Sequence, residues 1–145
     1  MGYHPVGLVD ASTLDRLHHV AYALGAIGIT TASAMSEVEA TKAQVDLTWF
    51  AQALGLTTPQ YGWVRFVTLG ESQQIVGHVD APYTERPFDR YHVPVATNRQ
   101  CWSFADGTWQ HLALGGIYWM DPTAEHGAVN WGATPRVHLL VDVLR

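Results

Sequence analysis

The chain has 145 residues, of which 48% are hydrophobic and 14% charged, and its formal net charge is −5 at pH 7. This length predicts a single domain, residues 1–145, that buries about two-thirds of its unfolded surface. Disordered chains contain too little apolar surface for such a core, so we expect order nearly throughout. The 8 lysine and arginine residues form no basic run. Nucleic-acid binding is therefore not expected, because neutralising a phosphate backbone requires clustered cations.

The N-terminal residues and the cysteine content bear on the cellular setting. The first ten residues, MGYHPVGLVD, lack the basic start and apolar core of a secretory signal. The one cysteine, Cys101, has no partner for an intrachain disulfide. No uncharged apolar run approaches the roughly 18 residues of a membrane-spanning helix. We expect a cytoplasmic protein with no membrane partner, and the short, apolar chain is compatible with a homodimer.

Residues 10–56 carry the helical signals. Ser12, with an aspartate three residues later, resembles a capping box, and apolar residues then recur at helical spacing until Gly25. A second helix is predicted from Ser36, where acidic residues favour the positive N-terminal end, to a stop at Gly55. We therefore expect two amphipathic helices in this part of the chain.

From residue 61 onward the hydrophobic period changes to two, and turn residues recur at short intervals. This pattern predicts β-strands. The candidate strands are residues 61–69, 74–79, 90–96, 101–104, 108–113, 117–120, 128–130 and 136–143. So many short strands predict an antiparallel sandwich or barrel over residues 61–145, with the two helices packed on one outer face.

The sequence HVD, at residues 78–80, is a candidate metal-binding motif. Residues i and i+2 of an extended chain point to the same face, so His78 and Asp80 can reach one point. A distant histidine would complete the set, and His126 is the natural third ligand. Two imidazoles and one carboxylate on one face of an octahedral ion are typical of mononuclear non-haem Fe(II) oxygenases. Taken alone, however, HxD is a weak motif that chance often supplies.

A cationic residue, Arg136, follows His126 at a distance of ten residues and begins the last predicted strand. Its planar guanidinium can bind a carboxylate through two parallel hydrogen bonds. This geometry suits the distal carboxylate of 2-oxoglutarate when the keto-acid end of that molecule chelates the metal. We therefore predict that 2-oxoglutarate spans from the iron to Arg136.

Four segments together resemble a known family, the aspartyl/asparaginyl β-hydroxylases, and in particular their relatives the bacterial free-proline hydroxylases. The segments are HVD, RYHVPVATN at residues 90–98, GGIYWMDPTAEHGAVN at 115–130 and PRVHLLVDV at 135–143. The resemblance covers residues 64–143 in the right order and spacing. It implies a mainly β fold with flanking N-terminal helices, the double-stranded β-helix or cupin-type jelly roll, which binds Fe(II) and 2-oxoglutarate.

The same resemblance implies residue roles. His78 and His126 match the iron-binding histidines, Arg136 matches the arginine that binds 2-oxoglutarate, and Arg90 and His92 match further co-substrate contacts. Family members use dioxygen and 2-oxoglutarate to hydroxylate an unactivated carbon of an amino acid such as Asp, Asn or Pro, free or within a peptide. The animal enzymes lack a carboxylate two residues after the first histidine. The proline hydroxylases have one there, as this chain does.

Structural roles remain open for several of these residues. His92 can instead be a buried histidine that bonds a backbone carbonyl, and Arg90 a solvated charge at a sheet edge. His138 lies on the same face of its strand as Arg136 and either contacts it or serves packing alone. Asp142 is expected to tie down the edge of the sheet rather than to touch the metal.

Substrate contacts are expected from residues near the proposed metal. The candidates are Arg86, in the loop of residues 83–89, together with Trp119 and Trp131, which can form a substrate wall. An alternative function is a non-catalytic cupin that binds a metal or a small acid as a sensor or scaffold.

Overall fold

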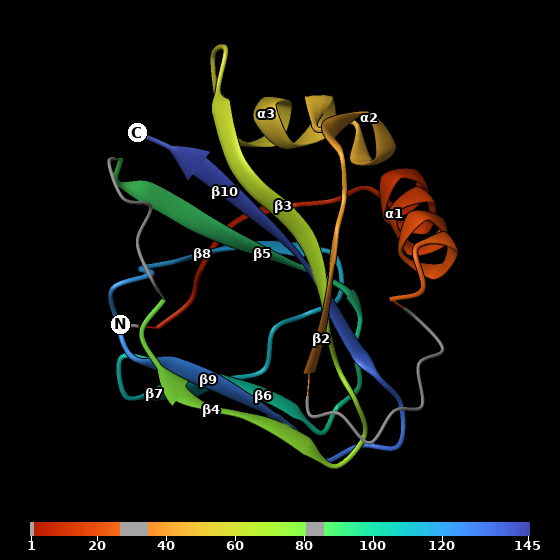
Figure 1. Ribbon diagram of the computed structural model, residues 1–145, viewed down its shortest axis with the longest axis vertical. Coiled ribbons are helices and arrows are strands. Elements are labelled where there is room, and N and C mark those ends of the chain that lie inside the picture. The colour runs from red at the N-terminus through yellow and green to blue at the C-terminus, as the bar shows by residue number, and fades with distance from the viewer. Residues whose placement is uncertain (1, 27–34, 81–85) are drawn as a thin grey trace.

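The computed structural model describes residues 2–26, 35–80 and 86–145, which form two antiparallel sheets that face each other (Figure 1). The larger sheet has the strand order β1-β8-β5-β10-β3-β2, and the smaller sheet has the order β4-β9-β6-β7. The strands are β1 (His4–Leu8), β2 (Met35–Glu39), β3 (Gln60–Leu69), β4 (Gln73–His78), β5 (Phe88–Ala96), β6 (Cys101–Ala105), β7 (Thr108–Gln110), β8 (Gly116–Met120), β9 (His126–Asn130) and β10 (Arg136–Leu144). The prediction of a mainly β fold is confirmed, and all eight predicted strands are present.

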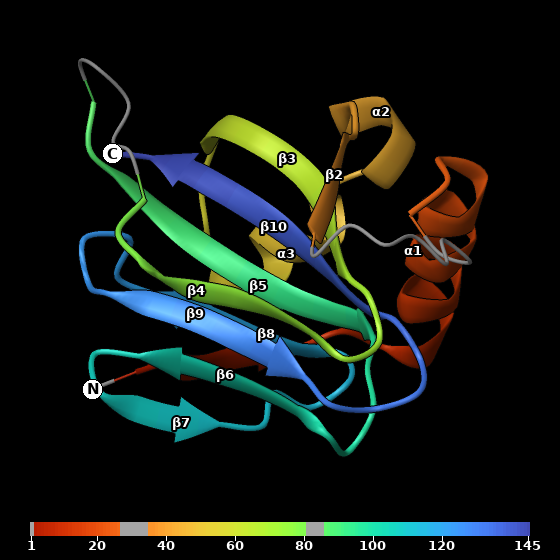
Figure 2. The same ribbon diagram turned by 60° about the horizontal axis from the view of Figure 1, so that its bottom comes forward.

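Three helices cover the face of the larger sheet that is turned away from the smaller sheet (Figures 1 and 2). They are α1 (Ala11–Ala23), α2 (Lys42–Val45) and α3 (Thr48–Leu54). The predicted capping residue Ser12 is wrong, because the cap lies two residues earlier, where the Asp10 carboxylate accepts a hydrogen bond from the Thr13 backbone N–H. The predicted stop at Gly55 is confirmed, since this glycine has φ 64° and ends α3. Every helix among the described residues is too short or too polar to span a bilayer.

The start of the second predicted helix is wrong. Met35–Glu39 forms strand β2, which pairs with β3 in antiparallel register, with Val38 opposite Phe66. The apolar residues of this segment, Met35 and Val38, are three positions apart, which suits a helix, and pairing with the long strand β3 overrides this local signal. Strand β1 was not predicted because it contains a proline and a glycine, which are tolerated at a sheet edge where one side has no partner strand.

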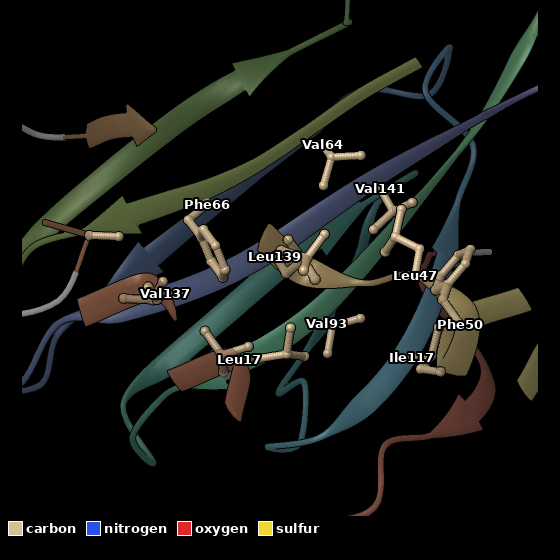
Figure 3. Packing of buried hydrophobic residues seen from close by; sticks show 14 residues of the cluster. Leu17, Leu47, Phe50, Val64, Phe66, Val93, Ile117, Val137, Leu139 and Val141 are labelled. Carbon is tan, nitrogen blue, oxygen red and sulfur yellow. The ribbon is translucent and has the colours of Figure 1, made fainter. Parts of the chain in front are cut away.

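Strand β10 lies at the centre of the larger sheet, between β3 and β5. Its odd-numbered residues Val137, Leu139 and Val141 point toward the helices, because successive side chains of a strand alternate between the two faces. They join a hydrophobic core with residues from the helices and the neighbouring strands (Figure 3). The labelled members are Leu17, Leu47, Phe50, Val64, Phe66, Val93, Ile117, Val137, Leu139 and Val141.

The opposite face of the same strands points toward the smaller sheet and carries buried polar residues. They are Arg65, Arg90, His92, Arg136, His138 and Asp142, each less than a tenth exposed. Burying charged groups costs free energy unless they are paired or bind a ligand. The space between the two sheets is therefore a candidate functional site, beside a small apolar cluster of Tyr3, Ala105, Leu112 and Met120.

The core between sheet and helices can be tested with a matched pair of substitutions. Leu139→Ala removes a fully buried side chain and is expected to lower the free energy of unfolding by about 2–5 kcal/mol. Leu8→Ala makes the same chemical change at a side chain that is 81% exposed, and we expect a change within about 0.5 kcal/mol. Urea denaturation followed by circular dichroism measures both. Equal effects would contradict the assignment of this face as the principal core.

Candidate metal centre

The side chains of His78, Asp80 and His126 meet at the mouth of the space between the sheets. One ligand atom from each lies within 4.8 Å of the other two. His126 Nε2 is 3.1 Å from Asp80 Oδ1, and His78 Nε2 is 3.3 Å from the same oxygen. Donor atoms this close, from two imidazoles and one carboxylate, form the set that can bind a divalent ion on one face. The sequence predicted this trio, and the fold brings it together.

Strand pairing explains why residues so far apart in sequence converge. His78, at the end of β4, is the register partner of His126, at the start of β9. The register is irregular between Ile75 and His78, and here the β4 backbone passes close to Gly127. A Cβ on Gly127 would lie 2.6 Å from the Ile75 carbonyl oxygen, so only glycine fits. This close approach holds the two imidazoles side by side, with ring centroids 4.3 Å apart.

Backbone carbonyls fix the orientation of both imidazoles. His78 Nδ1 is 2.8 Å from the Val76 carbonyl oxygen, and His126 Nδ1 is 2.9 Å from that of Ala124. Because a carbonyl only accepts, each Nδ1 must carry the proton and donate it. Each Nε2 then faces Asp80: without a metal ion, a proton on His126 Nε2 donates to the carboxylate, and a bound metal ion would take the place of that proton. This arrangement is common in metal sites, where a second contact sets the tautomer of the ligating histidine.

The carboxylate of Asp80 is held by Arg90, which is itself held by Asp142. Arg90 Nε and Nη2 each donate to one oxygen of Asp142 at 2.7 Å, and Nη1 donates to Asp80 Oδ2. Asp142 has no exposed surface. The bidentate pair fixes the guanidinium plane, and this plane fixes one oxygen of Asp80 while the other faces the histidines. Asp142 holds Arg90 from the central strand β10, so the expectation that it ties down the edge of the sheet is wrong.

These contacts shift the titration of the ligands. Burial acts to raise the pKa of Asp80, but the hydrogen bond to His126 and the charge of Arg90 outweigh it and hold that pKa well below its usual value. Burial acts to lower the pKa of His126, and the bond to Asp80 reverses the shift, so that its pKa is raised. Asp80 is therefore ionised at neutral pH, as a metal ligand must be.

A second cation, Arg136, also lines the pocket, and among the described residues its guanidinium hydrogen-bonds only to histidine. Its Nε and Nη2 are 3.0 and 2.8 Å from the two ring nitrogens of His138. A neutral imidazole has one acceptor nitrogen, so His138 accepts at most one of these bonds. His138 Nδ1 is also 3.1 Å from His92 Nδ1. Burial and then the charge of Arg136 hold the pKa of both histidines well below its usual value, so both are neutral near pH 7.

The polar groups around Arg136 are incompletely satisfied by the described residues. Arg136 Nη1 and His92 Nε2 are buried and have no hydrogen-bond partner there. No carboxylate among these residues forms an ion pair with Arg136, and burial lowers its pKa. A buried guanidinium without an anion is costly, and a ligand carboxylate would satisfy both orphaned atoms. The residues present therefore fit 2-oxoglutarate, with one carboxylate at Arg136.

Sequence reasoning missed three residues that line this pocket: Tyr3, Glu37 and Arg65. Burial raises the pKa of Tyr3 to about 12, so its phenol stays neutral. Glu37 was assigned to a helix that is in fact β2, and nothing in the sequence links Tyr3 to the site. Arg65 and Val67 share the face of β3 that lines the pocket, but only strand pairing shows which face of β3 that is.

The proposed substrate residues Arg86, Trp119 and Trp131 are not brought to the pocket wall. Arg86 donates to the Arg145 carbonyl and to the Gln60 side chain. The Trp119 indole donates to Asp89 at 2.9 Å, and Trp131 is 57% exposed. Residues 83–85 of the loop expected to contact substrate lie outside the described residues.

One curated enzyme is similar to part of this chain. An L-proline cis-4-hydroxylase of Rhizobium meliloti (strain 1021) is 31% identical over 80 residues. The aligned stretch is 55% of this chain and 29% of the relative, so the chain corresponds to only part of that enzyme.

Solved structures with low sequence identity share the fold. A viral collagen prolyl hydroxylase from Paramecium Bursaria Chlorella virus-1, solved with 2-oxoglutarate, has a TM-score of 0.66 at 11% identity and covers 98% of this chain and 94% of its own. The alpha-ketoglutarate-dependent epimerase SnoN of nogalamycin biosynthesis has a TM-score of 0.70 at 16% identity, covering 99% and 78%. The predicted cupin-type jelly roll is thereby confirmed.

The family model for aspartyl/asparaginyl β-hydroxylase matches residues 21–145, which include every candidate metal ligand and Arg136. The matched region is most of the chain, and it contains both sheets except for β1. This chain therefore belongs to the aspartyl/asparaginyl β-hydroxylase family.

Proposed function

We propose that the protein is a 2-oxoglutarate- and Fe(II)-dependent dioxygenase that hydroxylates an unactivated carbon of an amino acid. One observation carries this proposal. The trio of His78, Asp80 and His126 lines the same pocket as Arg136, a buried guanidinium with no carboxylate partner among the described residues. A metal site and an anion site facing one cavity match what a chelating keto acid with a distal carboxylate requires.

His78, Asp80 and His126 would hold the iron, and Arg136 with His92 would hold the far carboxylate of 2-oxoglutarate. When bound, iron and 2-oxoglutarate supply the oxidising chemistry by activating dioxygen, with succinate and carbon dioxide as by-products. The chain supplies orientation. The backbone carbonyls of Val76 and Ala124 aim the two imidazole lone pairs, and Arg90 fixes the plane of the Asp80 carboxylate.

The buried walls of the pocket protect the reaction. The co-substrate end is enclosed by the larger sheet, where Arg136 is 3% and His92 is 6% exposed. Exclusion of water strengthens the contact between Arg136 and an anion, because charges interact more strongly where the dielectric constant is low. The L-proline hydroxylase relative supports an amino acid as the substrate class. Whether that amino acid is free or within a peptide depends on the open end of the pocket.

The metal and co-substrate assignment predicts a spectroscopic signal. Anaerobic titration of the apoprotein with Fe(II) and 2-oxoglutarate is expected to give the visible charge-transfer band of a keto acid chelating iron. His126→Ala removes a ligand and should abolish the band, whereas His111→Ala changes an imidazole outside the pocket and should leave it intact. Absence of the band in the wild type would refute the oxygenase proposal and favour a metal-binding cupin without this chemistry.

The role of Arg136 predicts selective loss of co-substrate affinity. Arg136→Gln should raise the dissociation constant of 2-oxoglutarate by about 30-fold or more, since a charge-assisted pair contributes about 2 kcal/mol or more. The wild type should also bind 2-oxobutyrate, which lacks the distal carboxylate, much more weakly than 2-oxoglutarate. In Arg136→Gln this preference should disappear. Arg99→Gln, at an exposed turn, is the matched control, and a preference retained in Arg136→Gln would place the distal carboxylate elsewhere.

Asp142 is predicted to position the metal ligand Asp80 through Arg90. Asp142→Asn removes the anion that holds Arg90, and we expect the affinity for Mn(II), a redox-stable probe of the iron site, to fall about 10- to 100-fold. Asp89→Asn disrupts an ion pair with Arg145 outside the pocket and should leave metal affinity unchanged. Isothermal titration calorimetry measures both variants. Equal Mn(II) affinity in Asp142→Asn and wild type would show that Asp80 is positioned without this pair.

A further inference from the structure

Arg65, on β3, is a third buried arginine of the pocket, and its hydrogen-bonding capacity is largely unused. Its side chain is 8% exposed, and Nε and Nη1 have no hydrogen-bond partner among the described residues. The nearest carboxylate oxygens are those of Glu37, 3.4 Å from Nε, and of Asp142, 3.9 Å from Nη1. Arg90, by contrast, binds Asp142 through two bonds of 2.7 Å. Arg90 is therefore saturated, whereas Arg65 retains donors for a ligand.

The sheet register separates Arg65 from the co-substrate end. Arg136 is opposite Leu69, and Arg65 is opposite Leu140, four residues further along β10. At about 3.4 Å per residue the two arginines are roughly 14 Å apart along the strands. Both nevertheless line the same pocket as the metal ligands. One pocket thus contains two distinct sites for a carboxylate.

Charge distinguishes the two sites. Around Arg136 the closest partners are neutral histidines, so that end favours an anion alone. Beside Arg65 lies the carboxylate of Glu37, which is 47% exposed and lines the pocket. A lone anion at Arg65 would be repelled by Glu37. A ligand that presents a carboxylate to Arg65 and an ammonium group to Glu37 would satisfy both.

The charge of the whole pocket favours the same kind of ligand. Among the described residues, the charged groups that line it or pair with its arginines are three guanidinium groups and three carboxylates, from Arg65, Arg90, Arg136, Glu37, Asp80 and Asp142. A divalent metal ion balances the two negative charges of 2-oxoglutarate. The remaining ligand should therefore carry no net charge, as a zwitterionic amino acid does near pH 7.

The side chain of Trp63, on the same strand, lies against Arg65 beside the pocket. The Arg65 guanidinium lies over the Trp63 ring, 5.2 Å from its centroid, and Trp63 is 55% exposed. Stacking on the ring limits where the guanidinium can move, so that it is held ready for a carboxylate.

We propose that Arg65 and Glu37 are specificity-determining residues that bind the α-carboxylate and the α-ammonium of a free amino-acid substrate. This inference rests on the proposed function and deepens it, because a residue within a peptide chain lacks both charged groups. It places the substrate at the β2–β3 side of the pocket, with 2-oxoglutarate at the β5–β10 side and the metal ligands between the sheets.

The test measures substrate binding without turnover. The Fe(II) and 2-oxoglutarate form is prepared anaerobically, and its visible band is followed as L-proline, and then a mixture of the twenty protein amino acids, is added. The same titration is repeated with N-acetyl-L-proline and L-prolinamide. It is also repeated with a mixture of the N-acetylated amino acids and a mixture of the amino-acid amides. We expect wild-type protein to bind the zwitterions at least about 30-fold more tightly than either blocked form, as for loss of a charge-assisted pair.

Substitutions test the roles of Arg65 and Glu37 separately. Arg65→Gln should weaken binding of the zwitterion about 30-fold or more, Arg65→Lys less, and both should leave the dissociation constant of 2-oxoglutarate within about threefold. Glu37→Gln should weaken binding of the zwitterion but not of the N-acetylated form. The matched controls are Arg99→Gln and Glu71→Gln, at exposed turns outside the pocket.

The outcomes separate this inference from the proposed function. A band that forms normally while zwitterions fail to bind, or bind no better than the blocked forms, overturns the substrate subsite and leaves the oxygenase intact. Unchanged zwitterion binding in Arg65→Gln also overturns it. Absence of the band in the wild type refutes the proposed function itself. A retained band in each variant shows that the variant is folded, so that lost substrate binding is not a folding defect.

Discussion

The alternation of side chains along the central strand β10 is the constraint on which the rest of this structure depends. Odd-numbered residues of the strand pack against the helices, and even-numbered residues face the smaller sheet. A shift of one residue in register would exchange the two sets and bury charged groups in the core. The pairing of β10 with β3 and β5 therefore fixes both the hydrophobic core and the pocket at once.

The apolar face of β10 provides the stability that allows its other face to carry buried polar groups. Arg136, His138 and Asp142 are all buried on a strand whose other side is secured by Val137, Leu139 and Val141. Packing of the helices against that side provides stability that the interior between the sheets does not contribute, because much of that interior is polar. The pocket can consequently retain unsatisfied donors, which is what a site for charged ligands requires.

The three pocket arginines illustrate how partners define roles. Arg90 is saturated by Asp142 and Asp80, so its contacts are those of a residue that positions a metal ligand. Arg136 has only neutral histidines beside it, and Arg65 has Glu37 beyond hydrogen-bonding geometry. Residue type and burial are the same for all three, and only the surrounding carboxylates distinguish them. The expected co-substrate role of Arg90 thus remains a prediction, whereas its contact with Asp80 is a structural finding.

The sequence by itself determined the strands from residue 61 onward and the trio of candidate metal ligands, because both depend on spacing: a period of two for the strands, and HVD with a distant histidine for the trio. Local spacing favoured a helix at residues 36–39, and the backbone partners offered by β3 made this segment strand β2 instead. Local spacing also could not assign Tyr3, Glu37 and Arg65 to the pocket, since their convergence depends on which strands become neighbours. Only the tertiary structure decided which arginine has a carboxylate within reach. The partners are far apart in sequence, and strand pairing brings them together.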